Sequence, residues 1–164
     1  IYAEQRVPTI CLRPATDTRS DKVQSRTGIC FDGLTVPADE PEAIRHVIEQ
    51  YDVIGVDEIQ FFSPQIIPLL HKAMQYGKTV LVSGIDTDFR GEPFPATSAL
   101  LALPETIVMR TRAVCSVCRQ YTATRTQRLK NGEPVGHDEP TVVVEETGSI
   151  TTYEPRCVLH HIVR

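Results

Sequence analysis

Four residues in the last third of the chain have types and spacing that suit a metal ion. Cys115 and Cys118 form a C-x-x-C pair, and Cys157 begins a C-x-x-H segment that ends at His160. Thiolate and imidazole ligands in two such half-sites favour tetrahedral Zn²⁺, and four protein ligands leave no open position for catalysis. The pattern therefore predicts a structural zinc site. Two alternatives stay open: His161 can replace His160 as the fourth ligand, although the x-x spacing prefers His160, or the four residues can be unrelated buried side chains.

A second group of residues that could do chemistry follows a short apolar stretch and begins with Asp57 and Glu58. An Asp at the C-terminal end of a buried parallel strand can hold a hydrated Mg²⁺ beside the phosphates of a nucleotide. Glu58 should point to the other side of the strand and can face a second substrate. Asp86 and Asp88 follow the next apolar stretch, which suggests that two neighbouring strands end at one shared cleft. The alternative is that the acids only cap a strand or pair with an arginine.

A phosphate loop of the P-loop type is not visible in the sequence. Such a loop has the pattern G-x-x-x-x-G-K-[ST] between a strand and a helix. Gly77-Lys78-Thr79 has the last three residue types, but Lys72 stands where the first glycine should be. The segment also follows a predicted helix instead of preceding one. We therefore do not interpret it as a phosphate-binding loop.

The elements that must position these residues can be read from the apolar pattern. Apolar and amphipathic stretches alternate in the first two thirds of the chain, as is typical of a parallel sheet covered by helices. Strands are predicted at residues 7–12, 52–57, 79–82 and 106–109. Helices are predicted at residues 41–50 and 96–103, and from Pro64 to a capping Gly77. Residues 17–33 are predicted to form a loop or an irregular hairpin. The fold class is therefore α/β.

The chain changes character at about residue 113. Asn131-Gly132 is a turn signal between two predicted strands, at residues 122–129 and 141–144. Too few apolar residues lie in this region for an independent core, so a bound metal would contribute most to folding here. We predict two domains, an α/β nucleotide-binding domain over residues 1–112 and a zinc-binding domain over residues 113–164.

The composition excludes several broad classes of protein. Of the 164 residues 41% are hydrophobic and 23% are charged, which is ordinary for a globular chain. The net charge of −4 speaks against a broad electrostatic grip on nucleic acid. No apolar run approaches the roughly 20 residues that a membrane-spanning helix needs, so no membrane partner is expected. Five cysteines are too few for a disulfide scaffold, and we expect a reducing, cytoplasmic environment.

Five sequence motifs, taken together and in order, resemble the zinc-containing thymidine kinases of the cellular and bacterial type. The motifs are DEIQFF at 57–62, GIDTDFRGEPF at 84–94, AVCSVC at 113–118, ATRTQR at 123–128 and YEPRC at 153–157. The resemblance runs from about residue 1 to residue 161. It implies a RecA-like domain that carries ATP and a small zinc domain with a lasso loop that closes over the nucleoside.

The resemblance also implies a reaction, in which the γ-phosphoryl group of ATP is transferred to the 5′-hydroxyl of thymidine. Asp57 resembles the acid that orders Mg²⁺, and Glu58 resembles the base near the 5′-hydroxyl. Arg19 and Arg26 match the loop on the phosphate side. The residues that the resemblance places at the nucleoside are Gln60, Phe61, Ile85, Phe89, Phe94, Arg125, Arg128 and Tyr153.

Some of these roles have alternatives. Phe61 and Phe89 can be plain core residues, and Tyr153 can be a packing residue of the zinc domain. Arg125 and Arg128 can be solvated surface residues, and Arg19 and Arg26 can be too.

The family's phosphate loop precedes a helix that ends in a stretch like residues 1–7, so we expect the loop to lie before the first residue of this sequence. A catalytically silent nucleoside-binding module is the alternative function. A helicase-like ATPase fragment is a weaker one, because Asp-Glu-x-Gln also occurs there. The resemblance implies a homotetramer or homodimer, and deoxyuridine is a plausible second substrate.

Overall fold

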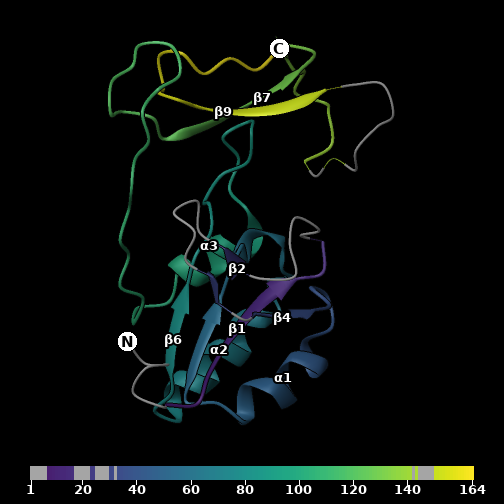
Figure 1. Cartoon of the computed structure of the whole chain (residues 1–164), viewed down its shortest axis with the longest axis vertical. Helices are drawn as coiled ribbons and strands as arrows, with labels where there is room; N and C mark the ends of the chain where they lie inside the picture. Colours follow the sequence, from purple (N-terminus) through teal and green to yellow (C-terminus); the bar gives the residue numbers. More distant parts are fainter. Residues whose placement is uncertain (1–6, 17–22, 25–29, 32, 142, 144–149) are drawn as a thin grey trace. The chain divides into compact units, whose positions relative to one another are not determined.

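The computed structural model describes residues 7–16, 23–24, 30–31, 33–141, 143 and 150–164 (Figure 1). The chain forms two compact units, Ile1–Asp86 with Pro95–Thr106 and Thr87–Phe94 with Ile107–Arg164, and each is described by itself. In the described part of the chain, no helix has the length and apolar character to span a bilayer. Arg19 and Arg26 lie outside the described residues, and the domain boundary expected after residue 112 stays a prediction.

The first unit is built on a four-stranded parallel sheet; a parallel sheet was predicted, but its strand at residues 33–36 was not. The strands are β1 (Thr9–Pro14), β4 (Gly33–Val36), β5 (Val53–Val56) and β6 (Thr79–Val82), in the order β4-β1-β5-β6. In the register of this sheet Leu12 pairs with Val56, which pairs with Val82 on its other side. The carboxyl ends of β5 and β6 are therefore neighbours.

Among the described residues, three α-helices connect or follow the strands of this sheet, and their course can be followed in Figure 1. They are α1 (Pro41–Glu49), α2 (Ile66–Gln75) and α3 (Pro95–Leu101), close to the predicted positions. Pro41 fits the first turn of α1 because the amide hydrogen that it lacks has no partner there. Gly77 follows α2 with a φ of 79°, the left-handed conformation in which glycine commonly ends a helix.

The apolar core of the first unit lies between the sheet and the helices. It is formed by inward-facing residues of the strands and one stripe of each helix, namely Leu12, Val36, Ile44, Ile48, Ile54, Val56, Ile59, Phe62, Ile66, Ile67, Leu70, Ala73 and Ala96. Ile59 and Phe62 follow Asp57 and Glu58 in the sequence and lie in this core. They therefore anchor the chain on the C-terminal side of the two acids.

The strands β2 (Val23–Gln24) and β3 (Cys30–Phe31) pair antiparallel. This pairing agrees with the irregular hairpin predicted at residues 17–33, as far as those residues are described.

The second unit contains a three-stranded antiparallel sheet in the order β8-β7-β9. β7 (Arg125–Lys130) turns back into β8 (Glu133–Pro134) through Asn131 and Gly132, both of which have positive φ, as a type I′ turn requires. The other edge of β7 pairs with β9 (Thr151–Arg156). A strand was predicted at residues 141–144, but Thr141 and Val143, its described residues, are not in a strand.

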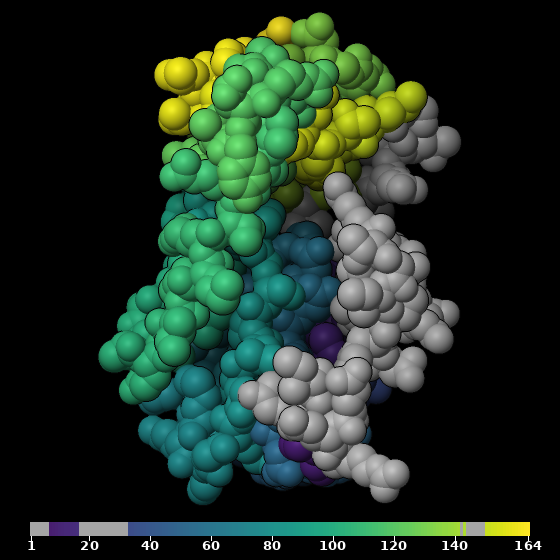
Figure 2. All heavy atoms as spheres, turned by 60° about the vertical axis from the view of Figure 1, so that its left-hand side comes forward, coloured from purple at the N-terminus to yellow at the C-terminus, as the bar shows by residue number. Residues whose placement is uncertain are grey.

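The predicted strand at residues 106–109 is wrong. This stretch has no strand conformation, and Ile107 and Met109 are 92% and 90% exposed. The chain passes from the first unit to the second between Thr106 and Ile107. Figure 2 shows this part of the chain, in green, at the molecular surface. An apolar run forms a strand only where another strand offers it hydrogen bonds, which the run itself does not reveal.

Candidate active site and metal centre

Asp57 lies where β5 ends, beside the end of β6. Its Oδ1 atom accepts a hydrogen bond from Ser83 Oγ at 2.6 Å and another from the backbone N–H of Glu58 at 3.0 Å. Asp57 and Glu58 are half-buried, so neither acid is sealed within the core. Two donors on one oxygen fix the plane of the Asp57 carboxylate. A carboxylate oriented in this way can present its charge to a cation at the sheet edge.

Glu58 has a left-handed backbone conformation, with φ 53° and ψ 47°. For a residue with a Cβ this conformation costs about 1–2 kcal/mol. It turns the chain sharply out of β5 and into the short 3₁₀ helix η1 (Ile59–Phe61), whose first amide hydrogen bonds back to the carbonyl of Ser83 at 3.1 Å. The strain is thus held in place by hydrogen bonds on the core side, and it sits on a candidate catalytic residue.

Gln60 is buried and joins the two strand ends. Its Nε2 donates to Oε2 of Glu58, and its Oε1 accepts the backbone N–H of Ile85 at 3.2 Å. Gly84 makes room for this arrangement, because a Cβ there would lie 2.5 Å from Gln60 Oε1. The structure therefore brings together Glu58, Gln60 and Ile85 of the predicted site residues. Phe61 lies half-buried in η1, and Ile85 is 41% exposed.

Phe89, Phe94, Arg125, Arg128 and Tyr153 belong to the second unit. Phe89 and Phe94 are buried, whereas Tyr153, on β9, is 55% exposed. Arg128, on β7, is buried, so the predicted alternative of a solvated side chain does not hold for it.

The guanidinium of Arg128 stacks on an aromatic ring. Its central carbon lies 3.9 Å from the ring centre of Phe89, and its Nη1 donates to the carbonyl of Pro140. Its Nη2 lies 3.8 Å from Glu139 Oε2. Arg125 is half-buried and donates to the carbonyl of Gly91 at 3.4 Å. Both arginines thus hold segments of the second unit together.

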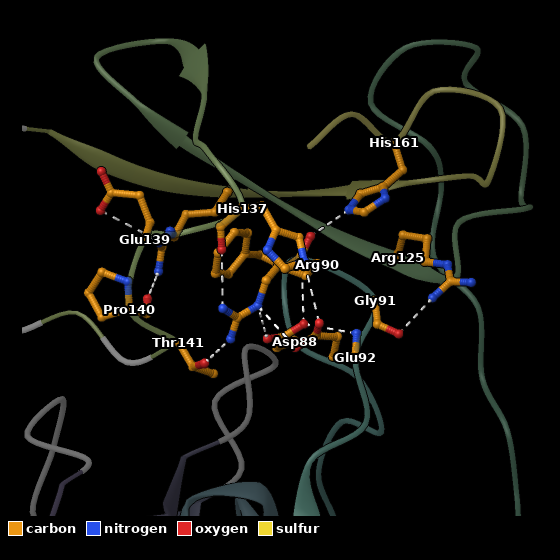
Figure 3. Close-up of polar contacts among 12 residues, drawn as sticks. Asp88, Arg90, Gly91, Glu92, Arg125, His137, Glu139, Pro140, Thr141 and His161 are labelled. Atoms are coloured by element: carbon orange, nitrogen blue, oxygen red, sulfur yellow. Dashed lines mark hydrogen bonds and ion pairs between the residues drawn. The ribbon is translucent and has the colours of Figure 1, made fainter. Parts of the chain in front are cut away.

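Arg90 forms the centre of a polar network that sequence reasoning did not find (Figure 3). Its Nε lies 2.9 Å from Asp88 Oδ2 and 3.3 Å from Glu92 Oε2, and its other nitrogens donate to the carbonyl of His137 and to Thr141 Oγ1. Asp88 and Glu92, each two residues from Arg90, were a sequence signal for its local ion pairs. Nothing in the sequence pointed to the partners about 50 residues away.

Cys115, Cys118, Cys157 and His160 lie together, as predicted. Their ligand atoms are all within 4.8 Å of one another, and His160 Nδ1 is 3.1 Å from Cys157 Sγ and 3.8 Å from Cys115 Sγ. Ligand atoms around a tetrahedral Zn²⁺ are about 3.5–3.8 Å apart at usual bond lengths. His161 instead has its Nε2 2.7 Å from the carbonyl of Phe89. The open choice between the two histidines therefore falls to His160.

The chemistry of the donor set also fits zinc. Burial raises the pKa of the Cys115 thiol, but hydrogen bonds from the backbone, led by those of Cys118 and Cys157, lower it to about 5. A sulfur that receives N–H groups in this way is prepared to be a thiolate, the form that binds metal. These residues can therefore hold one Zn²⁺ with no position left for substrate.

Two comparisons with known proteins show the family to which the chain belongs. The family model for thymidine kinase matches residues 1–161. A thymidine kinase of Coprothermobacter proteolyticus is 43% identical over 157 residues, which cover 94% of this chain and 76% of that protein. The chain belongs to the thymidine kinase family.

Proposed function

We propose that the protein transfers the γ-phosphoryl group of ATP to the 5′-hydroxyl of thymidine. Membership of the family supports the reaction class, and the pair of half-buried acids at the end of β5 supports the position of the chemistry. The comparisons give no support to a catalytically silent module. Phosphoryl transfer demands mainly positioning and charge stabilisation, which two fixed carboxylates can supply.

Asp57 is proposed to hold Mg²⁺. The hydrogen bonds from Ser83 and from the backbone of Glu58 orient its carboxylate at the sheet edge, where open α/β sheets bind ligands. Bound Mg²⁺ would offset the charge that develops on the phosphate oxygens. Oxygen ligands such as this one are those that Mg²⁺ prefers.

Glu58 is proposed to be the base. The left-handed backbone of Glu58 turns the chain out of β5, so Glu58 does not continue the strand that ends before Asp57. One acid can therefore bind the metal while the other contacts the alcohol. A carboxylate within hydrogen-bond reach of the 5′-hydroxyl holds the oxygen in line and accepts its proton late in the transfer.

The nucleoside is proposed to be bound by residues that the family resemblance suggests, namely Phe61, Ile85, Phe89, Phe94, Arg125, Arg128 and Tyr153. Arg19 and Arg26 are proposed to contact phosphate. For Arg128, burial and the stack on Phe89 favour an indirect contribution, in which it supports the ring. The exposed ring of Tyr153 favours a direct one.

A structural Zn²⁺ and assembly into a homodimer or homotetramer complete the proposal. The protein would work in the cytoplasm, where Cys115, Cys118 and Cys157 stay reduced for the metal.

The decisive experiment is Glu58→Gln in the full-length protein. We expect kcat to fall about 10²–10⁴-fold, which is the usual contribution of a general base, while the Kd for thymidine changes by less than about twofold. Glu42→Gln, which changes an exposed acid of α1, is the matched control and should behave as the wild type. If Glu58→Gln weakens thymidine binding as much as it lowers turnover, Glu58 is not the base.

A further inference from the structure

Gln60 is a buried side chain with both ends of its amide in use. It is 6% exposed, and its two hydrogen bonds reach the Glu58 carboxylate and the backbone of Ile85. The first partner follows β5 and the second follows β6. The amide has a second N–H and a second lone pair, but its burial leaves little of it accessible to a nucleoside.

The orientation of the amide is set by the backbone. The N–H of Ile85 requires an acceptor, so Oε1 must face it and Nε2 must face Glu58. Gly84 lets Oε1 approach, since a Cβ there would lie 2.5 Å away. The direction of the hydrogen bond to Glu58 is thereby fixed: Gln60 donates, and the carboxylate accepts.

Glu58 is the residue that needs such support. Its backbone lies in the left-handed region, and the chain is held on its C-terminal side by Ile59, whose N–H donates to Ser83. These contacts hold the main chain but leave the carboxylate to be directed by its own partners. The bond from Gln60 restricts the rotation of that carboxylate.

We propose that Gln60 is a positioning residue, which holds the carboxylate of Glu58, the proposed base, toward the 5′-hydroxyl, and that it does not contact the nucleoside. The proposal rests on the proposed function, because it takes Glu58 as the base. It replaces the substrate contact that the sequence suggested for Gln60. It also gives the sharp turn after β5 a purpose, since the turn brings residue 60 back against residue 58.

Two variants of the full-length protein test the proposal. Gln60→Glu keeps an acceptor for Ile85 but places a second carboxylate against Glu58, and Gln60→Met keeps the length of the side chain but removes the donor. In both variants we expect kcat to fall about 10–100-fold, the usual effect of removing a partner that orients a functional group. The Kd for thymidine should stay within about twofold of the wild type.

A double variant separates positioning from general damage. If Gln60 acts only through the carboxylate of Glu58, Glu58→Gln combined with Gln60→Met should have the kcat of Glu58→Gln alone, because the group that Gln60 positions is already lost. A change that only loosened the structure would instead lower kcat further in the double variant.

Gln127→Met is the matched control. Gln127 is also a buried glutamine, but its amide bonds to the backbone of Ile162 and Arg128 in the second unit. We expect a lower melting temperature for this variant and a kcat within about twofold of the wild type.

The outcomes distinguish this proposal from the proposed function. If Glu58→Gln keeps its turnover, Glu58 is not the base and the proposed function fails. If Glu58→Gln is inactive while both Gln60 variants keep the wild-type kcat, the positioning role of Gln60 alone is overturned. A rise in the Kd for thymidine with an unchanged kcat would also overturn it, because that result assigns Gln60 to the substrate.

Discussion

At the end of β5 two adjacent carboxylates are held by different kinds of partner. One oxygen of Asp57 accepts hydrogen bonds from the Ser83 hydroxyl and from a backbone N–H, whereas the carboxylate of Glu58 accepts one from the side-chain amide of Gln60. The two acids can thus be tuned separately although they are neighbours in sequence. A substitution that affects only one of them should change only one aspect of the reaction.

Ser83→Ala tests the support of Asp57. Removing the hydroxyl leaves Asp57 Oδ1 with the backbone donor alone, so the carboxylate is less well oriented for a cation. We expect the Mg²⁺ concentration for half-maximal rate to rise about 3–10-fold, while the Kd for thymidine stays unchanged. Ser98→Ala, at an exposed position in α3, is the control. An unchanged Mg²⁺ requirement in Ser83→Ala would remove Ser83 from this role.

The sequence was informative about ligand types and less so about side-chain direction. Asp57 and Glu58 could be found because acids after a buried strand lie at a sheet edge, and His160 was favoured over His161 by its spacing from Cys157. The role of Gln60 was not predictable, because the pattern DEIQFF does not show which way an amide points. Ser83 could have been found by the rule that identified Asp57, since it too follows a strand.

At the scale of the elements, the sequence predicted the helices and strands whose formation depends on residues close together in the chain. The helices α1 and α2 were found from apolar spacing and from Pro41 and Gly77, and strands β5 and β6 from short apolar runs. The stretch at residues 106–109 has the same composition as a strand but contains the point in the sequence where the first unit ends and the second begins. Likewise, the Asn131-Gly132 turn was correct, yet the long partner of β7 is β9 and begins at Thr151. Pairing between distant segments depends on which surfaces meet, which a turn signal does not encode.

Arg128→Met tests whether β7 is tied to its surroundings through the guanidinium. The substitution keeps the apolar stem but removes the stack on Phe89 and the hydrogen bond to Pro140. We expect a loss of about 2–4 kcal/mol in the free energy of unfolding, as for a buried charged hydrogen bond with a cation–π contact. Urea denaturation followed by circular dichroism measures it.

Arg164→Met is the comparison for this measurement. Arg164 forms an exposed ion pair with Glu133, and such a pair contributes about 0–1 kcal/mol. If Arg128→Met costs no more than Arg164→Met, the stack on Phe89 does not stabilise the second unit.

At the scale of the whole molecule, the two units draw their stability from different sources. The first has an extended apolar core between sheet and helices. Around the ligands of the second, the apolar cluster consists of Cys115, Ala123 and Cys157, with Cys118 packed against it. Hydrophobic burial of this extent stabilises little, so the fold there must gain free energy from another interaction. Metal binding supplies about 10 kcal/mol or more in small zinc domains.

Removal of the metal should therefore affect the two units unequally. In the full-length protein we expect one zinc per chain by elemental analysis. A strong chelator, or Cys118→Ser, should abolish the hydrogen-exchange protection of the amides in β7 and β9, while β5 and β6 keep theirs, because the first core contains no ligand.

Cys11→Ser is the matched control for this experiment, because it changes a cysteine of β1 that is not a ligand. Burial raises the pKa of the Cys11 thiol, so this cysteine stays protonated near neutral pH and does not compete for the metal. The variant should keep one zinc per chain and full protection in β7 and β9. If β7 and β9 stay protected after the metal has gone, their order comes from side chains such as Arg128, and the zinc does not hold this unit together. Loss of protection in both units at once would instead mean that the metal stabilises the chain as a single cooperative structure.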